Sequence, residues 1–417
     1  MKRLAMLSAA TVLAATILTP AYAEPAPRGT MIVIGGALSD GNKEIYREIV
    51  QRAGGARARI GVITAASVPP SQDPEAGKPL AANSVTNGRF YVDILKRYGA
   101  GAVQWVPVDL DHVAAADSAS VVRQVTSMTG FVFGGGDQYR LVSTLLHGAA
   151  HTDSRVLAAI RARFAQGAVV AGTSAGAQIQ AGRDMVTGGA SYQALRDGTH
   201  DGYFDDDTTL ADLPAGGFGL FGAGLLDTHF SANGRLGRAV RLAADRGHER
   251  VFGLDPDTAL EVTGDSLKVL GRHGVSVIDL RGATIGVRDG YWSISGVRWT
   301  YLTDGAVYHP STWSYEMPPG SPALKPADRT AVSPVQDIFD SAAADRKGFR
   351  LTRAALDLAG AGRSSLLLGM TYETNPVFVV ALRKGDGFAA YGNGKSAGAA
   401  VAFADLTVSM YSSPQRP

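Results

Sequence analysis

"AVVAGTSAGAQIQ", residues 168–180, is an apolar run that ends at Ser174 among glycines and alanines. An apolar run followed by G-x-S-x-G predicts a buried strand, a sharp turn and then a helix, the layout of a nucleophile elbow. Such a turn lifts the serine hydroxyl clear of the sheet, and the helix after it begins with unpaired N–H groups. Ser174 is therefore a candidate nucleophile. The alternative is that Gly172 and Gly176 only allow a strand and a helix to pack closely.

Strand-like and helix-like segments alternate along the rest of the chain. Short apolar runs of strand length are separated by segments of helical periodicity, several of which end in glycine. This alternation predicts an α/β fold with a mostly parallel sheet and helices on both faces. The expected strands are 30–36, 59–67, 102–109, 130–136, 168–172, 224–230 and 251–262, and the expected helices are 42–55, 84–100, 154–165 and 234–247, with others beginning at Asp117 and Asp137.

The chain divides into three expected segments. Residues 1–23 have a charged start, an apolar middle and a small-x-small site, the pattern of a cleavable signal peptide; the apolar run is short for a membrane anchor, the alternative. Residues 24–290 carry the alternation and every motif, and are expected to form a catalytic domain. Residues 291–417 change in character and predict a mixed α/β appendage of unknown role. Its expected elements are strands at 291–310, 364–383 and 387–406, a proline-rich link at 318–334 and a helix near 341–359.

Charge and cysteine content limit the classes of function. The 417 residues carry a formal net charge of +2, which loss of Lys2 and Arg3 with the signal peptide would cancel. No nucleic acid is therefore expected as a partner, and no membrane after cleavage. The chain has no cysteine, which excludes disulfides, thiolate metal sites and cysteine nucleophiles. Export without cysteine predicts a secreted or periplasmic protein.

A nucleophilic serine requires a base, and His229 is the strongest candidate among eight histidines. It ends the expected strand 224–230, so in a parallel sheet it would lie at the same carboxyl edge as Ser174. The weaker candidates are His200, in an acidic loop, and His147 and His151, which flank an expected helix end. The stretch "HGAAH" (147–151) has i, i+4 histidines but lacks the glutamate of H-E-x-x-H, so no metal site is expected.

A third group must orient the imidazole. Asp255 and Asp257, in "GLDPDTAL", follow the next expected strand and are the candidate acids. Asp227 lies two residues before the histidine and could instead point into the pocket.

Two glycine-rich stretches follow other strands. "FGGGDQYR" (133–140) lets the backbone approach a substrate, and the N–H of Gly136 is expected to complete an oxyanion hole with that of Ala175. Asp137 in the same stretch is also a candidate helix N-cap. "VIGGALSDG" (33–41) lacks the G-x-G-x-x-G spacing, so no cofactor is expected.

Taken in order, these motifs resemble the cyanophycinase and peptidase E group of serine peptidases over roughly residues 30–265. The resemblance implies a class I glutamine-amidotransferase-like α/β fold and an acyl-serine mechanism. It rests on "VIGGA" (33–37), "GVITAAS" (61–67), "FGGGDQ" (133–138), "GTSAGA" (172–177), "DTHFSANGRLGR" (227–238) and "GLDPDTA" (253–259).

Matched by position, the resemblance assigns roles to several residues and leaves one open. The family's triad glutamate falls at Pro256, so Asp255, Asp257 or an acid from elsewhere must serve. Relatives usually carry glutamine at the position of Thr228 and arginine at that of Asn233. The implied roles are nucleophile for Ser174, base for His229, oxyanion donors for Gly136 and Ala175, and substrate binding for Asp137, Gln138, Asp227, Thr228, Arg235 and Arg238.

The resemblance, the signal peptide and the appendage together imply an exported serine exopeptidase that hydrolyses cyanophycin to β-Asp-Arg dipeptides. Cyanophycin is a polyaspartate backbone that bears arginines through β-carboxyl amide links, so its site must bind carboxylate and guanidinium. Arg235 and Arg238, three apart on one expected helix, suit a carboxylate, and Asp227 and Asp137 could take the guanidinium. A solvated helix face is the alternative for the arginines.

Other functions remain open at this stage. The enzyme could be a related serine peptidase that acts on α-aspartyl or other acidic dipeptides. An α/β-hydrolase-type esterase would place its histidine later in the chain than His229 and would not predict "GGGDQ". A non-catalytic periplasmic binding protein is the alternative that Pro256 favours. A homodimer is compatible with the sequence, which does not fix the oligomeric state.

Overall fold

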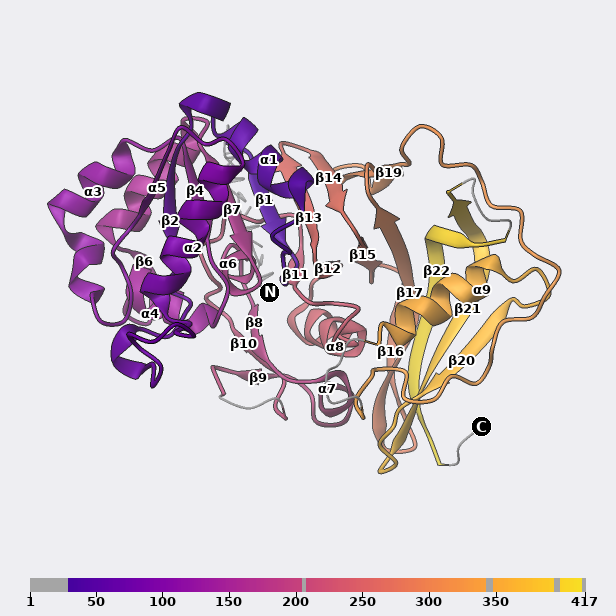
Figure 1. Ribbon diagram of the computed structural model, residues 1–417. Helices are drawn as coiled ribbons and strands as arrows, with labels where there is room; N and C mark the ends of the chain where they lie inside the picture. Colours follow the sequence, from indigo (N-terminus) through magenta and orange to yellow (C-terminus); the bar gives the residue numbers. More distant parts are fainter. Residues whose placement is uncertain (1–28, 205–207, 343–347, 394–397, 415–417) are drawn as a thin grey trace, which may run out of the picture.

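The computed structural model of the protein describes residues 29–204, 208–342, 348–393 and 398–414. The expected signal peptide therefore lies outside the described residues. Figure 1 shows two large sheets. Helices of the N-terminal half of the chain pack around one of them, and the other is built mainly from the C-terminal half. No helix in the described ranges is both long and apolar enough to cross a membrane.

The central sheet has nine strands and contains the expected parallel core. Its five parallel strands are ordered β1-β7-β4-β2-β3, and four more strands extend it from β1 in antiparallel pairs. The parallel arrangement is confirmed, whereas the antiparallel extension was not expected. In sheet order the strands are β19 (Ser314–Glu316), β18 (Val307–His309), β14 (Ser266–Gly271), β13 (Thr258–Thr263), β1 (Met31–Ile34), β7 (Val169–Thr173), β4 (Gly130–Phe133), β2 (Arg59–Ile63) and β3 (Ala102–Trp105).

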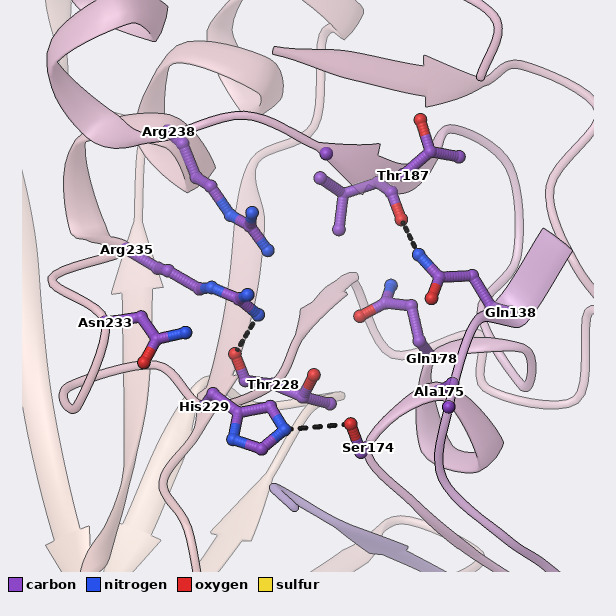
Figure 2. Close-up of a pocket in the computed structure, with 13 residues that line it drawn as sticks. Gln138, Ser174, Ala175, Gln178, Thr187, Thr228, His229, Asn233, Arg235 and Arg238 are labelled. Carbon is purple, nitrogen blue, oxygen red and sulfur yellow. Dashed lines mark hydrogen bonds between the residues drawn. The ribbon is translucent and has the colours of Figure 1, made fainter. Parts of the chain in front are cut away.

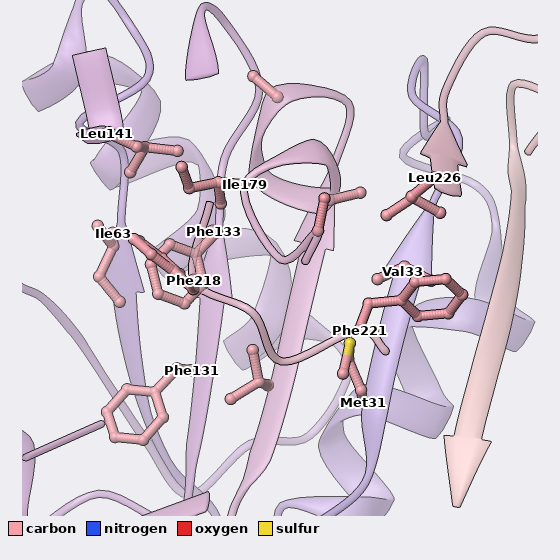
Figure 3. Close-up of a cluster of buried hydrophobic side chains, with 14 of the residues drawn as sticks. Met31, Val33, Ile63, Phe131, Phe133, Leu141, Ile179, Phe218, Phe221 and Leu226 are labelled. Carbon is pink, nitrogen blue, oxygen red and sulfur yellow. The ribbon is translucent and has the colours of Figure 1, made fainter. Parts of the chain in front are cut away.

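Helices cover both faces of the parallel strands, because these strands carry apolar residues on both faces. In β1, Ile32 and Ile34 pack in one buried cluster with α1 and α2. Met31 and Val33 point to the other face, where they join a cluster with α3, α4 and α5 (Figure 3). These helices are α1 (Lys43–Arg52), α2 (Ser84–Arg97), α3 (Ala119–Thr126), α4 (Gln138–Leu145) and α5 (Arg155–Ala165), with single turns of 3₁₀ helix at Gly55–Arg57, Pro70–Gln72 and Val113–Asp117.

The second sheet is antiparallel except for the pair β11 and β12. Its buried side chains form a third cluster with α7 (Ser191–Asp197), α8 (Leu236–Arg246) and α9 (Arg350–Gly360). The strands, in sheet order, are β11 (Leu225–Asp227), β12 (Arg250–Leu254), β15 (Gly274–Asp279), β17 (Tyr291–Thr303), β22 (Ala400–Ser413), β21 (Val377–Gly392) and β20 (Leu366–Met370), and β16 (Thr284–Arg288) pairs with β17.

The chain crosses between the two sheets, which corrects two expectations. The run 251–262, expected as one strand, forms β12 in the second sheet and β13 in the central sheet. The turn Asp255-Pro256-Asp257 joins them, because proline cannot continue a ladder and Asp257 has a positive φ of 54°. The strand before His229 is β11, which belongs to the second sheet and not to the parallel sheet. His229 therefore approaches Ser174 from the neighbouring sheet.

The C-terminal residues continue the second sheet. β15, before residue 290, pairs with β17, after it, over six residues. The expected boundary at 290 thus falls inside one continuous sheet. The expected strands 364–383 and 387–406 have the wrong bounds. The first range contains β20 and the start of β21, and the second contains the end of β21 and the start of β22, because β21 and β22 pair as antiparallel neighbours.

Short elements complete the fold. Part of the segment expected as an acidic surface loop pairs into a small sheet, since main-chain groups of the loop find partners there. The short elements are β8 (Met185–Gly188), β10 (Ala211–Leu213) and β9 (His200–Asp201) in one sheet, β5 (Leu146–His147) and β6 (Thr152–Asp153) in another, and α6 (Ala175–Gln178).

Candidate active site

Ser174 lies on a strained turn between β7 and α6. Its backbone has φ 53° and ψ −118°, in a region that L-residues rarely adopt. A Cβ built on Gly172 would overlap the carbonyl oxygen of Gly176, and one built on Gly176 would overlap that of Phe133. The flanking glycines are therefore required for close backbone approach, and the turn they allow is a nucleophile elbow as expected.

His229 lies beside this serine. Its Nε2 is 2.8 Å from Oγ of Ser174 (Figure 2). The histidine has a positive φ of 49°, and its N–H donates to the carbonyl oxygen of Gly35 at 2.7 Å. His229 follows a strand of the second sheet, but this hydrogen bond fixes it to the segment that follows β1 of the central sheet.

The surroundings of His229 favour its neutral form. Burial, together with the nearby positive charge of Arg235, lowers the pKa of the imidazole to about 4, against the opposing charge of Asp227. A neutral imidazole has a free ring nitrogen that can accept a proton. At neutral pH the histidine can therefore take the hydroxyl proton of Ser174.

Two N–H groups lie near this pair as the sequence predicts. Gly136 and Ala175 both line the pocket that contains Ser174. Neither N–H donates a hydrogen bond to another group of the described chain. Gly136 has a φ of 139°, and a Cβ there would overlap the carbonyl oxygen of Ala66, so only glycine fits. Both donors are available to an oxygen bound beside Ser174.

Neither candidate acid contacts the imidazole among the described residues. Asp255 is fully buried, and its two oxygens accept the N–H of Ser231 at 2.8 Å and the hydroxyl of Tyr301 at 2.7 Å. Burial raises the pKa of this carboxyl. The position after β12 therefore anchors the loop that follows His229, instead of orienting the imidazole.

Asp257 is also occupied elsewhere. Its carboxylate accepts hydrogen bonds from Ser39 at 2.9 Å and Asn42 at 2.9 Å, and pairs with Arg272 at 3.1 Å. It therefore ties the loop after β1 to the start of α1. Both carboxylates are therefore bonded to groups other than the imidazole.

Asp227 and Arg238, both expected to bind substrate, form a buried ion pair. Nε and Nη2 of Arg238 donate to the two oxygens of Asp227 at 2.8 and 2.6 Å, and its Nη1 donates to the carbonyl oxygen of Gly189 at 2.7 Å. The two side chains are 1% and 6% exposed. The positive charge lowers the pKa of Asp227 even against the cost of burial. Asp227 does not line the pocket, and Arg238 reaches it with its charge already paired.

Arg235 is the more accessible of the two arginines. Its side chain is 21% exposed, and Nη1 donates to the carbonyl oxygen of Thr228 at 2.6 Å while lying 3.4 Å from Asp227. Thr228 lines the pocket beside it. Arg235 therefore supplies positive charge to the pocket wall, in the way expected of a group that binds a carboxylate.

The pocket has a volume of about 310 Å³ and a largely polar wall. Figure 2 shows the arginines on one side and the amides of Gln138 and Gln178 on the other. Nε2 of Gln138 donates to the carbonyl oxygen of Val186 at 3.0 Å, and Nε2 of Gln178 to that of Leu226 at 2.8 Å. These two amides face the arginines across the space in front of Ser174.

Asp137 has a structural position outside this pocket. It caps α4 as expected, accepting the N–H of Tyr139 at 2.8 Å, and it also accepts the hydroxyl of Tyr203 at 2.7 Å. The carboxylate expected to contact a substrate guanidinium is therefore already hydrogen-bonded within the protein and does not line the pocket.

Several contributors to the site were missed from the sequence, among them Gln178, Thr187 and Gly36. Gln178 lies one turn after Ser174, and that spacing was the available signal. Thr187 lies in a segment with no recognisable motif. Gly36 packs against the ring of His229, where a Cβ would overlap Cε1 and Nε2. The glycine pair in "VIGG" was the signal for this contact, although it was examined only as a dinucleotide motif and as part of the family resemblance.

The weaker histidine candidates lie elsewhere. His147 is 3.1 Å from a carboxylate oxygen of Asp117, and Nδ1 of His151 is 3.0 Å from the carbonyl oxygen of Gly216. Neither lines the pocket with Ser174. An elbow serine, an adjacent neutral histidine and two N–H donors define the site of a serine hydrolase.

Known proteins show which serine hydrolases the chain is similar to. The sequence model of peptidase family S51 matches residues 79–270. A cyanophycinase of Nostoc sp. is 30% identical over 257 residues, which cover 61% of this chain and 74% of that protein. A cyanophycinase of Synechococcus elongatus is 30% identical over 291 residues, covering 68% and 79%. The crystal structure of a peptidase from an acI-B1 actinobacterium gives a TM-score of 0.44 at 17% identity, covering 68% of this chain and 97% of that one.

The chain belongs to peptidase family S51. It is a serine-type peptidase, so its substrate is a peptide. The resemblance expected from the motifs is thereby confirmed.

Proposed function

We propose that the protein is an exported exopeptidase that hydrolyses cyanophycin to β-Asp-Arg dipeptides. The observation that carries the proposal is the 2.8 Å contact between Oγ of Ser174 and Nε2 of His229 at one end of a pocket with Arg235 in its wall. The contact supplies an activated nucleophile, and the arginine supplies a partner for an acidic residue.

The chemistry follows from this arrangement. Oγ of Ser174 attacks the scissile carbonyl carbon while its proton passes to Nε2 of His229. The carbonyl oxygen becomes an oxyanion that accepts the N–H groups of Gly136 and Ala175. The imidazolium returns the proton to the leaving amine, and the C–N bond breaks to leave an acyl-serine. Water then attacks the acyl carbon by the same route in reverse, which frees the acid product and the serine.

The pocket wall suits a carboxylate in the substrate. Arg235 is charged, partly exposed and close to the carbonyl oxygen of Thr228, while Gln138 and Gln178 offer amide oxygens and N–H groups on the opposite side. A carboxylate of an aspartyl residue can pair with the arginine while the scissile bond lies over Ser174. The cyanophycinases named above are the known proteins that this substrate assignment follows.

A related serine peptidase for α-aspartyl or other acidic dipeptides is the second candidate. The small volume of about 310 Å³ favours it, because such a pocket accepts short peptides. A non-catalytic binding protein is less well supported. No acid among the described residues is hydrogen-bonded to His229, which favours it, whereas the contact with Ser174 and the two N–H donors have no role in simple binding.

The deciding experiment incubates purified residues 24–417 with insoluble cyanophycin and identifies soluble products by mass spectrometry. The Ser174→Ala variant is run alongside. Release of β-Asp-Arg by the wild type alone supports both the substrate and the nucleophile. If no product forms but acidic dipeptides are cut, the cyanophycin assignment fails and the second candidate replaces it. Binding of cyanophycin or of acidic dipeptides without turnover would favour the non-catalytic binding protein.

Export is part of the proposal and rests on residues 1–23. Their charged start, apolar middle and small-x-small site are the pattern of a cleavable signal peptide. Expression of the full chain in a Gram-negative host, followed by fractionation, tests it. A protein recovered outside the cytoplasm with residue 24 at its N-terminus is expected; an intact N-terminus in the cytoplasm would overturn export.

A further inference from the structure

A second cavity lies beside the active-site pocket. It has a volume of about 130 Å³, and Asn233 lines both spaces. Part of its wall comes from the start of α7, at Ser191 and Gln193. The rest comes from the C-terminal part of the chain, including Phe339 and Glu373, which lies outside the residues that the family S51 model matches.

Close contacts fix the C-terminal wall against the catalytic part. The carbonyl of Phe339 lies so near Gly234 that a Cβ there would overlap it. The hydroxyl of Tyr192 donates to the carbonyl oxygen of Asn375 at 2.6 Å, two residues after Glu373. The second cavity is therefore a formed feature of the fold, adjacent to the loop that carries His229.

Two acceptor atoms on residues that line this cavity lack donors. Oε1 of Gln193 and Oε2 of Glu373 are buried, and neither has a hydrogen-bond partner within the described ranges. Buried oxygens without partners are uncommon in native proteins, because each loses its hydrogen bonds to water. The nearby cation Arg196 is already paired with both carboxylate oxygens of Asp197. Gln193 and Glu373 line the cavity, so a small rotation of either side chain would bring its unpartnered oxygen to a donor bound there.

We propose that this cavity is a subsite for the guanidinium of an arginine side chain in the peptide substrate. The proposal rests on the proposed peptidase function and extends it to the recognition of a basic residue next to the acidic one. Arg235 gives the main pocket a positive charge and Glu373 gives the second cavity a negative one. The two neighbouring spaces therefore match a peptide that carries both charges.

A guanidinium fits the two acceptors better than an ammonium. Gln193 and Glu373 lie on separate elements, and a guanidinium presents five N–H donors in a planar fork that can reach two acceptors at once. Asn233 adds no charge between the two spaces. An arginine at that position, as the resemblance gives for relatives, would place a second cation beside the proposed subsite.

The test compares short synthetic oligomers of β-Asp-Arg with matched oligomers of β-Asp-citrulline. Citrulline has the same length but is neutral. The wild type is expected to prefer arginine by about tenfold or more in kcat/KM, since the hydrogen bonds to Glu373 are charge-assisted. The Glu373→Gln variant should lose that preference. Its kcat/KM should fall for the arginine oligomer and stay unchanged for the citrulline oligomer. Glu249→Gln, at an exposed position away from both cavities, should retain it.

A binding measurement separates failure of the subsite from failure of the proposed function. Calorimetry with the same oligomers uses Ser174→Ala and the double variant Ser174→Ala/Glu373→Gln. A preference for arginine that Glu373→Gln removes supports the subsite even if the wild type cuts neither oligomer. Equal binding of both oligomers, or a preference that survives Glu373→Gln, overturns it. Gln193→Leu, which keeps the volume but removes the second acceptor, gives the same decision if Glu373→Gln does not fold.

Discussion

Gly36 lies against the imidazole of His229 at a point where no side chain fits. A Cβ built on this glycine would overlap both Cε1 and Nε2 of the ring. The φ of Gly36 is 101°, a conformation that other residues adopt only with strain. Together with the hydrogen bond from His229 to Gly35, this contact sets the position of the proposed base from the central sheet.

Gly36→Ala is therefore expected to displace the imidazole from Ser174. A misplacement of about 1 Å costs on the order of 100-fold in rate, so kcat/KM should fall by about that factor. Gly41→Ala is the matched control, since a Cβ at Gly41 meets nothing within 4 Å. Thermal unfolding of both variants checks that the protein is folded. Wild-type activity in Gly36→Ala would show that the contact does not position the base.

Ser174 offers a test of the strained elbow. Its φ of 53° suits glycine better than any other residue, so Ser174→Gly should be more stable than Ser174→Ala by about 1 kcal/mol. Both variants should lose turnover by at least about 10³-fold because the nucleophile is absent. Urea unfolding measures the difference. Equal stability of the two variants would mean that the turn stores no strain.

The pH dependence of kcat/KM reports on His229. Because burial lowers its pKa to about 4, activity should persist below the ordinary histidine pKa of 6.5 and fall only near pH 4. Arg235 lowers the pKa as well, so Arg235→Gln should move the acid limb to higher pH. Burial is the larger cause, and the limb should still lie below 6.5. A soluble aspartyl peptide provides the assay, and an acid limb at 6.5 in the wild type would contradict the burial of the imidazole.

The same pKa shift affects stability. Between pH 6.5 and about 4 the unfolded chain binds a proton at His229 that the folded chain does not. The free energy of unfolding should therefore decrease as pH falls through this range, by up to about 3 kcal/mol. His229→Gln removes this part of the slope. Urea unfolding at several pH values compares the two proteins, and identical slopes would show that His229 titrates normally.

The sequence predicts the core of the fold for a definite physical reason. β1, β2, β4 and β7 are short, and apolar side chains lie on both of their faces, a pattern typical of parallel strands between helices. The elbow was also predictable, because small residues around Ser174 have few other uses on a strand-to-helix turn. The contact with His229 was predicted correctly, although from the wrong sheet.

The remaining features depend on partners that the sequence pattern does not specify. Periodicity indicates that residues 251–262 are extended, but it does not indicate that Pro256 sends the two halves to different sheets. Spacing places Arg235 and Arg238 on one helix face, yet only the structure shows which of them is neutralised by Asp227. The wall that includes Glu373 comes from a segment far along the chain, with no motif to mark it.

The ion pair of Asp227 and Arg238 should be structural in its effects. Asp227→Asn leaves Arg238 buried without its counter-charge, which typically costs about 3–5 kcal/mol of unfolding free energy. Asp328→Asn is a control, since its pair with Arg363 is exposed and should leave stability unchanged. Urea unfolding of each variant measures the effect. If the Asp227→Asn protein is as stable as the wild type but binds substrate poorly, the role of Asp227 is substrate binding and not structural.

The last prediction concerns the acid of a catalytic triad. Asp255 is bonded to Ser231 and Tyr301, and Asp257 to Ser39, Asn42 and Arg272, so neither carboxylate is bonded to the imidazole. Loss of a true triad acid lowers kcat by about 10⁴-fold. Asp255→Asn and Asp257→Asn should instead lose less than about tenfold in kcat and keep the acid limb of the pH profile, while unfolding at lower temperature. A drop of the triad magnitude in a folded variant would identify that residue as the acid, and would require the turn at Pro256 to rearrange when substrate binds.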